Sequence, residues 1–125
     1  QIGTLFALST ESSASEAFKQ RCLGLPEGGT MLCLKKLSPT RLVRNGLFDI
    51  IAEAEADGAG TEDLREILGH AASKRGIFEG DTEHGELEIG QIASAVNDIR
   101  PAGEIIERLI VEYREALNSL TGATF

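Results

Sequence analysis

The side chains best suited to metal chemistry lie in one acidic segment, residues 79–88. Asp81, Glu83, His84 and Glu86 combine carboxylates with an imidazole, which are ligand types that bind divalent metal ions. A metal site also needs three or four ligands in fixed positions, and this segment contains glycine and no second histidine. Its spacing does not fit an EF-hand loop. We therefore expect an exposed acidic loop and assign no metal ligand.

Three further side chains could act as a base or a nucleophile. His70 falls late in an expected helix, where an imidazole interacts favourably with the carbonyl end. Cys22 and Cys33 match no metal, redox or disulfide motif, so we expect buried, reduced thiols. The sequence has no Gly-x-Ser-x-Gly nucleophile motif. We therefore assign no catalytic residue.

The first residues of the sequence carry a different kind of signal. The run from Gln1 to Leu8 is largely apolar and predicts a short buried strand. Ile2 is followed by Gly3 and Thr4, and a strand that ends in Gly-Thr lets backbone amides approach a phosphate, with the threonine hydroxyl as a further donor. Without further evidence, the physics of these four residues favours an ordinary turn.

The elements that must position these residues are mainly helical. Ser13 and Glu16 have the spacing of a capping box, and the helix that follows should end at Gly24. Ser38-Pro39 predicts the start of a second helix, within which Asn45-Gly46 is either a turn or a weak point. Residues 30–34 predict a short strand.

The second half of the sequence predicts three more helices. Thr61 should cap a helix that runs to Lys74-Arg75, and apolar spacing predicts another helix over residues 87–99. The last helix has the clearest pattern, because its apolar residues repeat at three and four. They are Ile105, Ile106, Leu109, Ile110, Tyr113, Leu117 and Leu120.

Composition limits the class of protein. The sequence has 125 residues, 42% of them hydrophobic and 5% aromatic, which predicts a single domain with an aliphatic core. The net charge is −8, and basic residues form no stripe, so we expect no nucleic-acid partner. No apolar run is long enough to span a bilayer, and we expect a cytoplasmic protein.

Three segments together resemble the nitronate monooxygenase family, formerly called 2-nitropropane dioxygenase, which includes the flavin-type enoyl-acyl-carrier-protein reductases. Residues 1–6 read Gln-Ile-Gly-Thr-x-Phe and lead into a Phe18-Lys19 helix, Arg41 to Asn45 matches an Arg-x-x-x-Asn segment, and residues 78–92 match a Gly-Asp, Gly and Gly-Gln pattern. These motifs cover nearly the whole sequence in the right order. One departure is Leu5, where the family usually has arginine.

The resemblance implies an FMN-dependent (β/α)₈ barrel. Gln1, Ile2, Gly3 and Thr4 would end its eighth strand, with Gly3 and Thr4 on the FMN phosphate, and Gly90-Gln91 would lie near the barrel mouth.

Such a barrel takes about 250 residues, so the resemblance implies a C-terminal fragment without the first seven strands. We expect a mainly α domain over residues 1–125, with four or five helices around an aliphatic core and a short N-terminal strand. This fragment should hold no FMN and have no activity alone. The alternatives are a helical interaction module and a small FMN protein built from two chains. The unpaired N-terminal strand would favour a homodimer.

Overall fold

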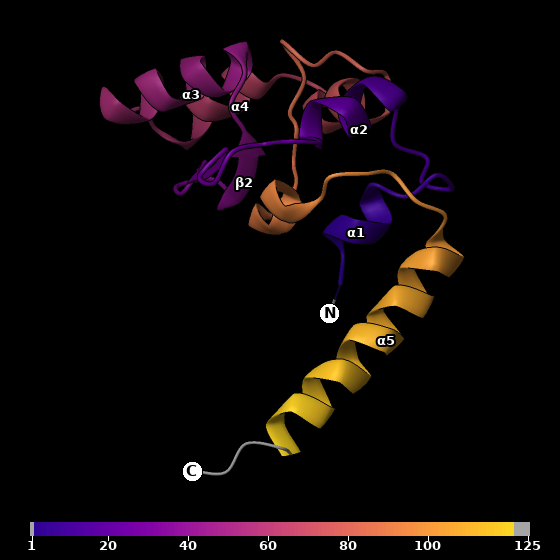
Figure 1. Cartoon of the computed structure of the whole chain (residues 1–125). Coiled ribbons are helices and arrows are strands. Elements are labelled where there is room, and N and C mark those ends of the chain that lie inside the picture. The colour runs from indigo at the N-terminus through magenta and orange to yellow at the C-terminus, as the bar shows by residue number, and fades with distance from the viewer. Residues whose placement is uncertain (1, 122–125) are drawn as a thin grey trace.

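Residues of two short strands contribute to two apolar clusters. Figure 1 shows how the helices and strands are arranged. The computed structural model describes residues 2–121. Along the chain the elements are α1 (Thr4–Ala7), α2 (Glu16–Cys22), β1 (Thr30–Cys33), β2 (Thr40–Val43), α3 (Gly46–Ala56), α4 (Thr61–Leu68), the π-helical turn η1 (Lys74–Phe78), the 3₁₀ helix η2 (Gln91–Ala95) and α5 (Ala102–Thr121).

β1 and β2 pair in an antiparallel hairpin, with Thr30 opposite Val43 and Cys33 opposite Thr40. Successive residues of a strand point to opposite faces. Val43 accordingly packs in the first cluster, with α2 and residues from 87 to 96, whereas Leu42 packs in the second, with α3 and α4. Both clusters are aliphatic except for Phe18 and Cys22 in the first and Phe48 and Cys33 in the second. The mainly α architecture around an aliphatic core is thus confirmed.

The predicted N-terminal strand is wrong. Thr4–Ala7 forms the short helix α1, which begins with a bond from the amide of Ala7 to the carbonyl of Gly3 at 2.9 Å. Within residues 2–8 the structure has no strand. A short apolar run fits a helix or a strand equally well, and here contacts with η2 and α5 select the helix. The expectation of a dimer through this strand loses its basis.

Two predicted caps are also wrong. Ser15, not Ser13, caps α2, because its hydroxyl accepts a bond from the Phe18 amide at 3.2 Å. The residues after Ser38-Pro39 form β2 and not a helix. The helix begins later, at Gly46, where the Asn45 side chain is the N-cap.

The predicted helix from Thr61 to Arg75 is interrupted. Thr61 lies inside α4, and the amide of the capping residue Gly60 bonds to the Asp63 carboxylate at 2.8 Å. α4 ends at Leu68, and the chain turns before η1. The turn includes Ala71, whose φ of 58° lies in the left-handed region.

Ala71 provides a test of this turn. An alanine in the left-handed region is strained by about 1 kcal/mol, and glycine is not. Because Ala71 is exposed, its methyl group contributes no core packing. We expect Ala71→Gly to raise the free energy of unfolding by about 0.5–1 kcal/mol. Urea denaturation followed by circular dichroism would measure it, and a destabilised variant would contradict this account of the turn.

The predictions for residues 79–99 need two corrections. The acidic segment is exposed only in part, since Gly85, Glu86 and Leu87 are buried. The predicted helix over residues 87–99 is instead an extended stretch, with a bridge from Glu88 to Leu42, followed by η2. Leu87, Ala93 and Val96 nevertheless pack in the first cluster, so the apolar pattern marked burial and not helical structure.

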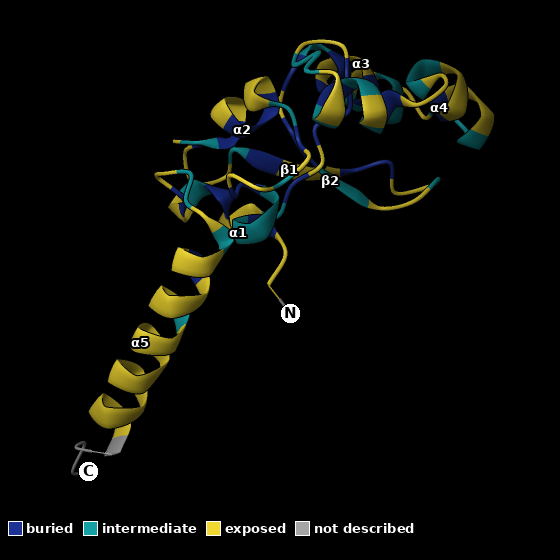
Figure 2. Ribbon diagram, turned by 90° about the vertical axis from the view of Figure 1, so that its right-hand side faces the viewer, coloured by how far each residue is buried: buried dark blue, intermediate teal, exposed yellow. Residues whose placement is uncertain are grey.

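The predicted last helix is confirmed as α5, which extends away from the body of the molecule (Figures 1 and 2). Its first turn is fixed from the other end of the chain, because both carboxylate oxygens of Glu11 accept the amide of Ala102, at 2.9 and 3.1 Å. This bond lowers the pKa of Glu11. Among the residues described, no helix is sufficiently long and apolar to cross a membrane.

Candidate functional site

The residues proposed for the phosphate lie at the start of α1. Gln1 is outside the described residues. Ile2 is 49% exposed, Gly3 precedes the helix with φ −105° and ψ −54°, and Thr4 is buried. The amides of the first turn of a helix have no acceptor within the helix. In α1 these are the amides of residues 4–6, and the space beside Gly3 is open, with no atom within 4 Å of where a Cβ would lie.

Thr4 joins two of the motif segments. A Cβ built on Gly90 would lie 2.5 Å from the Thr4 hydroxyl oxygen, closer than real Cβ contacts, so a larger residue at position 90 would displace Thr4. The segments at residues 2–4 and at residues 90–92 are therefore neighbours in space, although they are far apart in the sequence. The absence of a side chain at Gly90 is what allows Thr4 to occupy its buried position.

The surface around these segments is hollow and largely apolar. A hollow of about 370 Å³ is lined by Ile2, Gly3, Thr4, Leu5, Ile92 and Leu109. Thr4 contributes the one hydroxyl among them. The free amides and this hydroxyl fit the phosphate end of FMN, whereas these residues include no cation and leave the hollow open on one side. The described residues thus fit one end of the cofactor and provide no enclosure for the rest.

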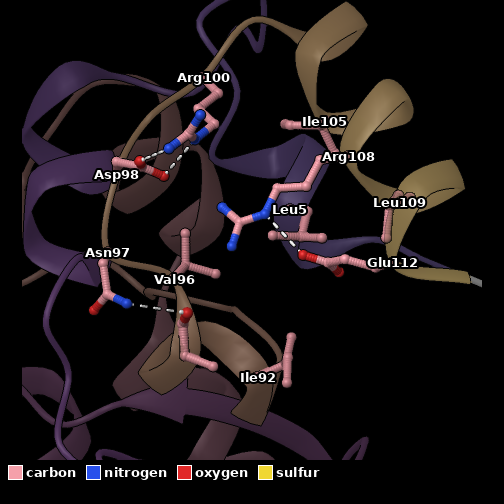
Figure 3. A pocket seen from close by; sticks show the side chains of 11 residues that line it. Leu5, Ile92, Val96, Asn97, Asp98, Arg100, Ile105, Arg108, Leu109 and Glu112 are labelled. Carbon is pink, nitrogen blue, oxygen red and sulfur yellow. Dashed lines mark hydrogen bonds and ion pairs between the residues drawn. The ribbon is translucent and has the colours of Figure 1, made fainter. Parts of the chain in front are cut away.

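An adjacent cavity of about 340 Å³ separates η2 from α5 (Figure 3). Arg100 donates to Asp98 on one wall, and Arg108 donates to Glu112 at 2.7 Å on the other. The hydrogen bonds from Arg100 lower the pKa of Asp98, and those to Asp98 raise the pKa of Arg100. Each guanidinium is therefore matched by a carboxylate of the same wall. The pair of Arg100 and Asp98 favours the charged forms of both groups, which suits neither a general acid nor a general base near neutral pH.

The acidic segment is ordered by its own carboxylates. The Asp81 side chain accepts the amides of His84 at 2.8 Å and Glu83 at 3.3 Å, and the His84 bond is the main cause of a lowered Asp81 pKa. Glu86 points elsewhere and accepts the hydroxyl of Ser73 at 2.6 Å. Among residues 2–121 no three histidine, cysteine or acidic side chains are grouped as metal ligands would be.

Sequence reasoning missed the junction that holds this segment, which consists of Asn45, Gly76 and Gly85. A Cβ on Gly85 would overlap the backbone of Gly76, and the Asn45 side-chain amide donates to the carbonyls of Gly85 at 2.9 Å and Thr82 at 3.0 Å. Gly85 and Asn45 both belong to segments that resemble the family motifs, and this resemblance was the signal that could have indicated the junction. In the structure they allow the segments around residues 45, 76 and 85 to pack closely.

The remaining candidate side chains do not form a site. His70 lies in the turn after α4 and is exposed, so its predicted position late in a helix is wrong. Cys22 and Cys33 are buried, free thiols, as predicted. Burial raises the pKa of each thiol from 9.0 to about 11, and for Cys33 the charges of Glu55 and Glu86 add to the effect.

The two thiols give the chain a defined pH dependence. A raised pKa means that the folded chain holds these protons more tightly than the unfolded chain does. Stability from this source is complete below pH 9 and is lost as the pH rises toward 11. We expect the thiolate absorbance of the folded chain to appear only near pH 11, and that of the urea-unfolded chain near pH 9. Equal titration midpoints would contradict the burial.

The fold is similar to part of a larger known structure. No protein-family profile matches the chain, and no curated protein matches it significantly. Among solved structures, the chain is similar to part of FabK from Thermotoga maritima, which is a TIM-barrel protein. The TM-score is 0.87 and the sequence identity is 30%, over 98% of this chain and 39% of FabK. A methionine-to-alanine mutant of FabK gives a TM-score of 0.78 and 27% identity, over 98% of this chain and 36% of that one.

The chain therefore spans about two fifths of the length of the structures it matches. The likeness extends over almost every element described above, and it is one of sequence as well as fold. Its mainly helical composition is that of one part of a larger barrel rather than of a whole barrel.

Proposed function

We propose that the chain is part of an FMN-dependent barrel oxidoreductase of the nitronate monooxygenase group, and that it is inactive alone. The observation that carries this proposal is the likeness to FabK, which groups with the flavin-dependent enoyl-acyl-carrier-protein reductases. The contact between Thr4 and Gly90 supports it, because residues from two separate motifs of that family meet there. In this proposal the chain is cytoplasmic, and its substrate, a nitronate or an enoyl thioester, is selected by residues elsewhere in the barrel.

Gln1, Ile2, Gly3 and Thr4 would hold the phosphate of the cofactor. FMN supplies the electron transfer when bound, and these residues only bind and orient it. The free amides at the start of α1 and the Thr4 hydroxyl are donors for phosphate oxygens. Leu5 replaces the arginine usual in the family, so this chain relies on neutral donors at that point.

The chain alone should not retain the cofactor. A site of this kind buries most of its ligand, whereas the hollow at residues 2–5 is open. FMN fluorescence titrated with the chain should show no saturable quenching at micromolar concentrations. Saturable quenching would instead support the alternative of a small FMN protein built from two chains.

A chimera provides the test of the phosphate site. In it this chain replaces the corresponding part of FabK, and FMN binding is measured by fluorescence quenching. Thr4→Val removes one donor to a charged group, worth about 1.5 kcal/mol, so the dissociation constant should rise about tenfold. Thr61→Val in α4 is the matched control and should leave it unchanged. If both variants bind FMN equally well, Thr4 is not a phosphate ligand.

A second candidate function is a helical interaction module without a catalytic role. The exposed apolar residues of α5 favour it, because such a surface is typical of a binding face. This candidate predicts that the chain binds a partner but that the chimera acquires no FMN.

A further inference from the structure

The turn that follows α1 is bonded to the start of α5. The amide of Thr10 donates to the carbonyl of Arg100 at 3.1 Å. Both carboxylate oxygens of Glu11 accept the amide of Ala102, the first residue of α5, at 3.1 and 2.9 Å. The first amides of a helix have no acceptor within the helix, and an anion is favourable at that end. Glu11 therefore caps α5 from a distant segment, and we call this contact the Glu11 cap.

Hydrogen bonds also fix the turn that carries Glu11. Ser9 is buried, and its hydroxyl donates to the carbonyl of Phe6 in α1 at 2.8 Å. The hydroxyl of Thr10 donates to the Glu11 carboxylate at 2.9 Å. Lys19 of α2 is buried as well, and its ammonium lies 3.5 Å from the carbonyl of Thr10. The carboxylate is thus placed relative to α1, which carries the candidate phosphate residues.

The position of α5 determines the shape of the hollow beside Thr4. Leu109 lines this hollow, and Ile105, which is 7% exposed, lines the adjacent cavity. Leu109 lies seven residues after Ala102, which is about 10 Å along the helix. A tilt of about 10° at the first turn would therefore move Leu109 by about 2 Å. A shift of this size would admit water to the hollow, and water weakens hydrogen bonds to a phosphate.

We infer that Glu11 is a positioning residue for the proposed phosphate site, because it holds α5 at the angle at which Leu109 lines the hollow. Glu11 is bonded to Thr10 and to the start of α5, so it acts through α5 and not on the phosphate itself. The donors proposed for the phosphate all lie in residues 1–4, and Glu11 is an addition to them. This inference rests on the proposed function.

Tyr113 provides a measurement in the chain alone, because it lies on α5 and is the single tyrosine of a sequence without tryptophan. Glu11→Ala removes the carboxylate and should lower the fluorescence anisotropy of Tyr113, since the start of α5 loses its cap. Glu11→Gln keeps one acceptor oxygen, so its anisotropy should lie between those of the parent chain and Glu11→Ala.

Asp63→Ala is the matched control. The exposed Asp63 carboxylate accepts the amide of Gly60 at 2.8 Å, so it caps α4 as Glu11 caps α5. Both alanine variants lose a helix cap and should lower the unfolding midpoint by similar amounts. Only Glu11→Ala should lower the anisotropy of Tyr113, which separates a positioning role from a general loss of stability.

The same variants in the FabK chimera test the effect on the phosphate site. An anion at a helix start contributes an amount that corresponds to about a threefold change in a binding constant. Glu11→Ala should therefore raise the dissociation constant of FMN about threefold, and Glu11→Gln should restore part of the loss. Asp63→Ala should leave the dissociation constant unchanged.

Two results would overturn the inference: an unchanged Tyr113 anisotropy in Glu11→Ala, or a dissociation constant of FMN that Glu11→Ala and Asp63→Ala change equally. A failure of the proposed function is distinguishable. A parent chimera that binds no FMN contradicts the flavin assignment, and the anisotropy then decides by itself whether Glu11 positions α5. A parent chimera that binds FMN, with an affinity that Glu11→Ala leaves unchanged, keeps the proposed function and contradicts this inference.

Discussion

Replacing Gly85 with alanine is expected to lower the free energy of unfolding of the chain by at least about 4 kcal/mol. The new Cβ would overlap the Cα and amide of Gly76 and lie 2.5 Å from the carbonyl oxygen of Asp81. All three obstacles are backbone atoms, which cannot move aside as the end of a side chain can. The crossing of the two segments must therefore open, which also displaces the buried Leu87 two residues later.

Urea denaturation of the purified variant, followed by circular dichroism, measures this loss. Gly103→Ala is the matched control, since a Cβ there meets no atom within 4 Å and the residue lies in the exposed first turn of α5. Alanine should be neutral or stabilising there by up to about 1 kcal/mol. A Gly85→Ala variant as stable as the parent chain would show that the crossing is not tight.

Asn45→Ala is expected to lower the free energy of unfolding by about 3 kcal/mol. The buried Asn45 side chain caps α3 through the Phe48 amide at 2.9 Å and donates to the carbonyls of Thr82 and Gly85. Each such bond contributes about 1 kcal/mol, and the buried groups left without a partner add to the loss. Because two of the bonds reach the acidic segment, the substitution should loosen residues 82–85 as well as the start of α3.

Asn45→Asp separates the two roles of this side chain. A carboxylate can still accept the Phe48 amide, but it would oppose the carbonyl oxygens of Thr82 and Gly85, which need a donor. We expect Asn45→Asp to be at least as destabilised as Asn45→Ala at neutral pH. Asn97→Ala, at an exposed side chain, should change stability by less than about 0.5 kcal/mol. If Asn45→Ala lowered the free energy of unfolding by less than about 1 kcal/mol, Asn45 would not hold the junction in the way described.

The sequence predicted those elements that a local pattern indicates. The repeat of apolar residues in α5 and the short apolar run at residues 30–34 are such patterns, and both elements are present. The errors arose where distant contacts decide. Ser38-Pro39 resembles a helix start, but Thr40–Val43 pairs with β1. The apolar residues after Leu87 have helical spacing, yet Glu88 bridges to Leu42 and the buried side chains come from extended chain.

The candidate phosphate site rests on the family resemblance and stays a prediction. Physical reasoning alone left residues 1–4 as compatible with a turn, and it offered no role for Gly90. The family resemblance selected both segments, and the structure places Thr4 against Gly90.

The flavin content of the purified FabK chimera tests the central claim most directly. If the chain is part of an FMN-dependent barrel, the chimera should purify with FMN bound in stoichiometric amount, while the chain alone purifies without it under the same conditions. FMN released by denaturation and measured by absorbance gives the ratio to protein. A soluble, folded chimera that neither retains FMN nor takes it up on titration would contradict the claim.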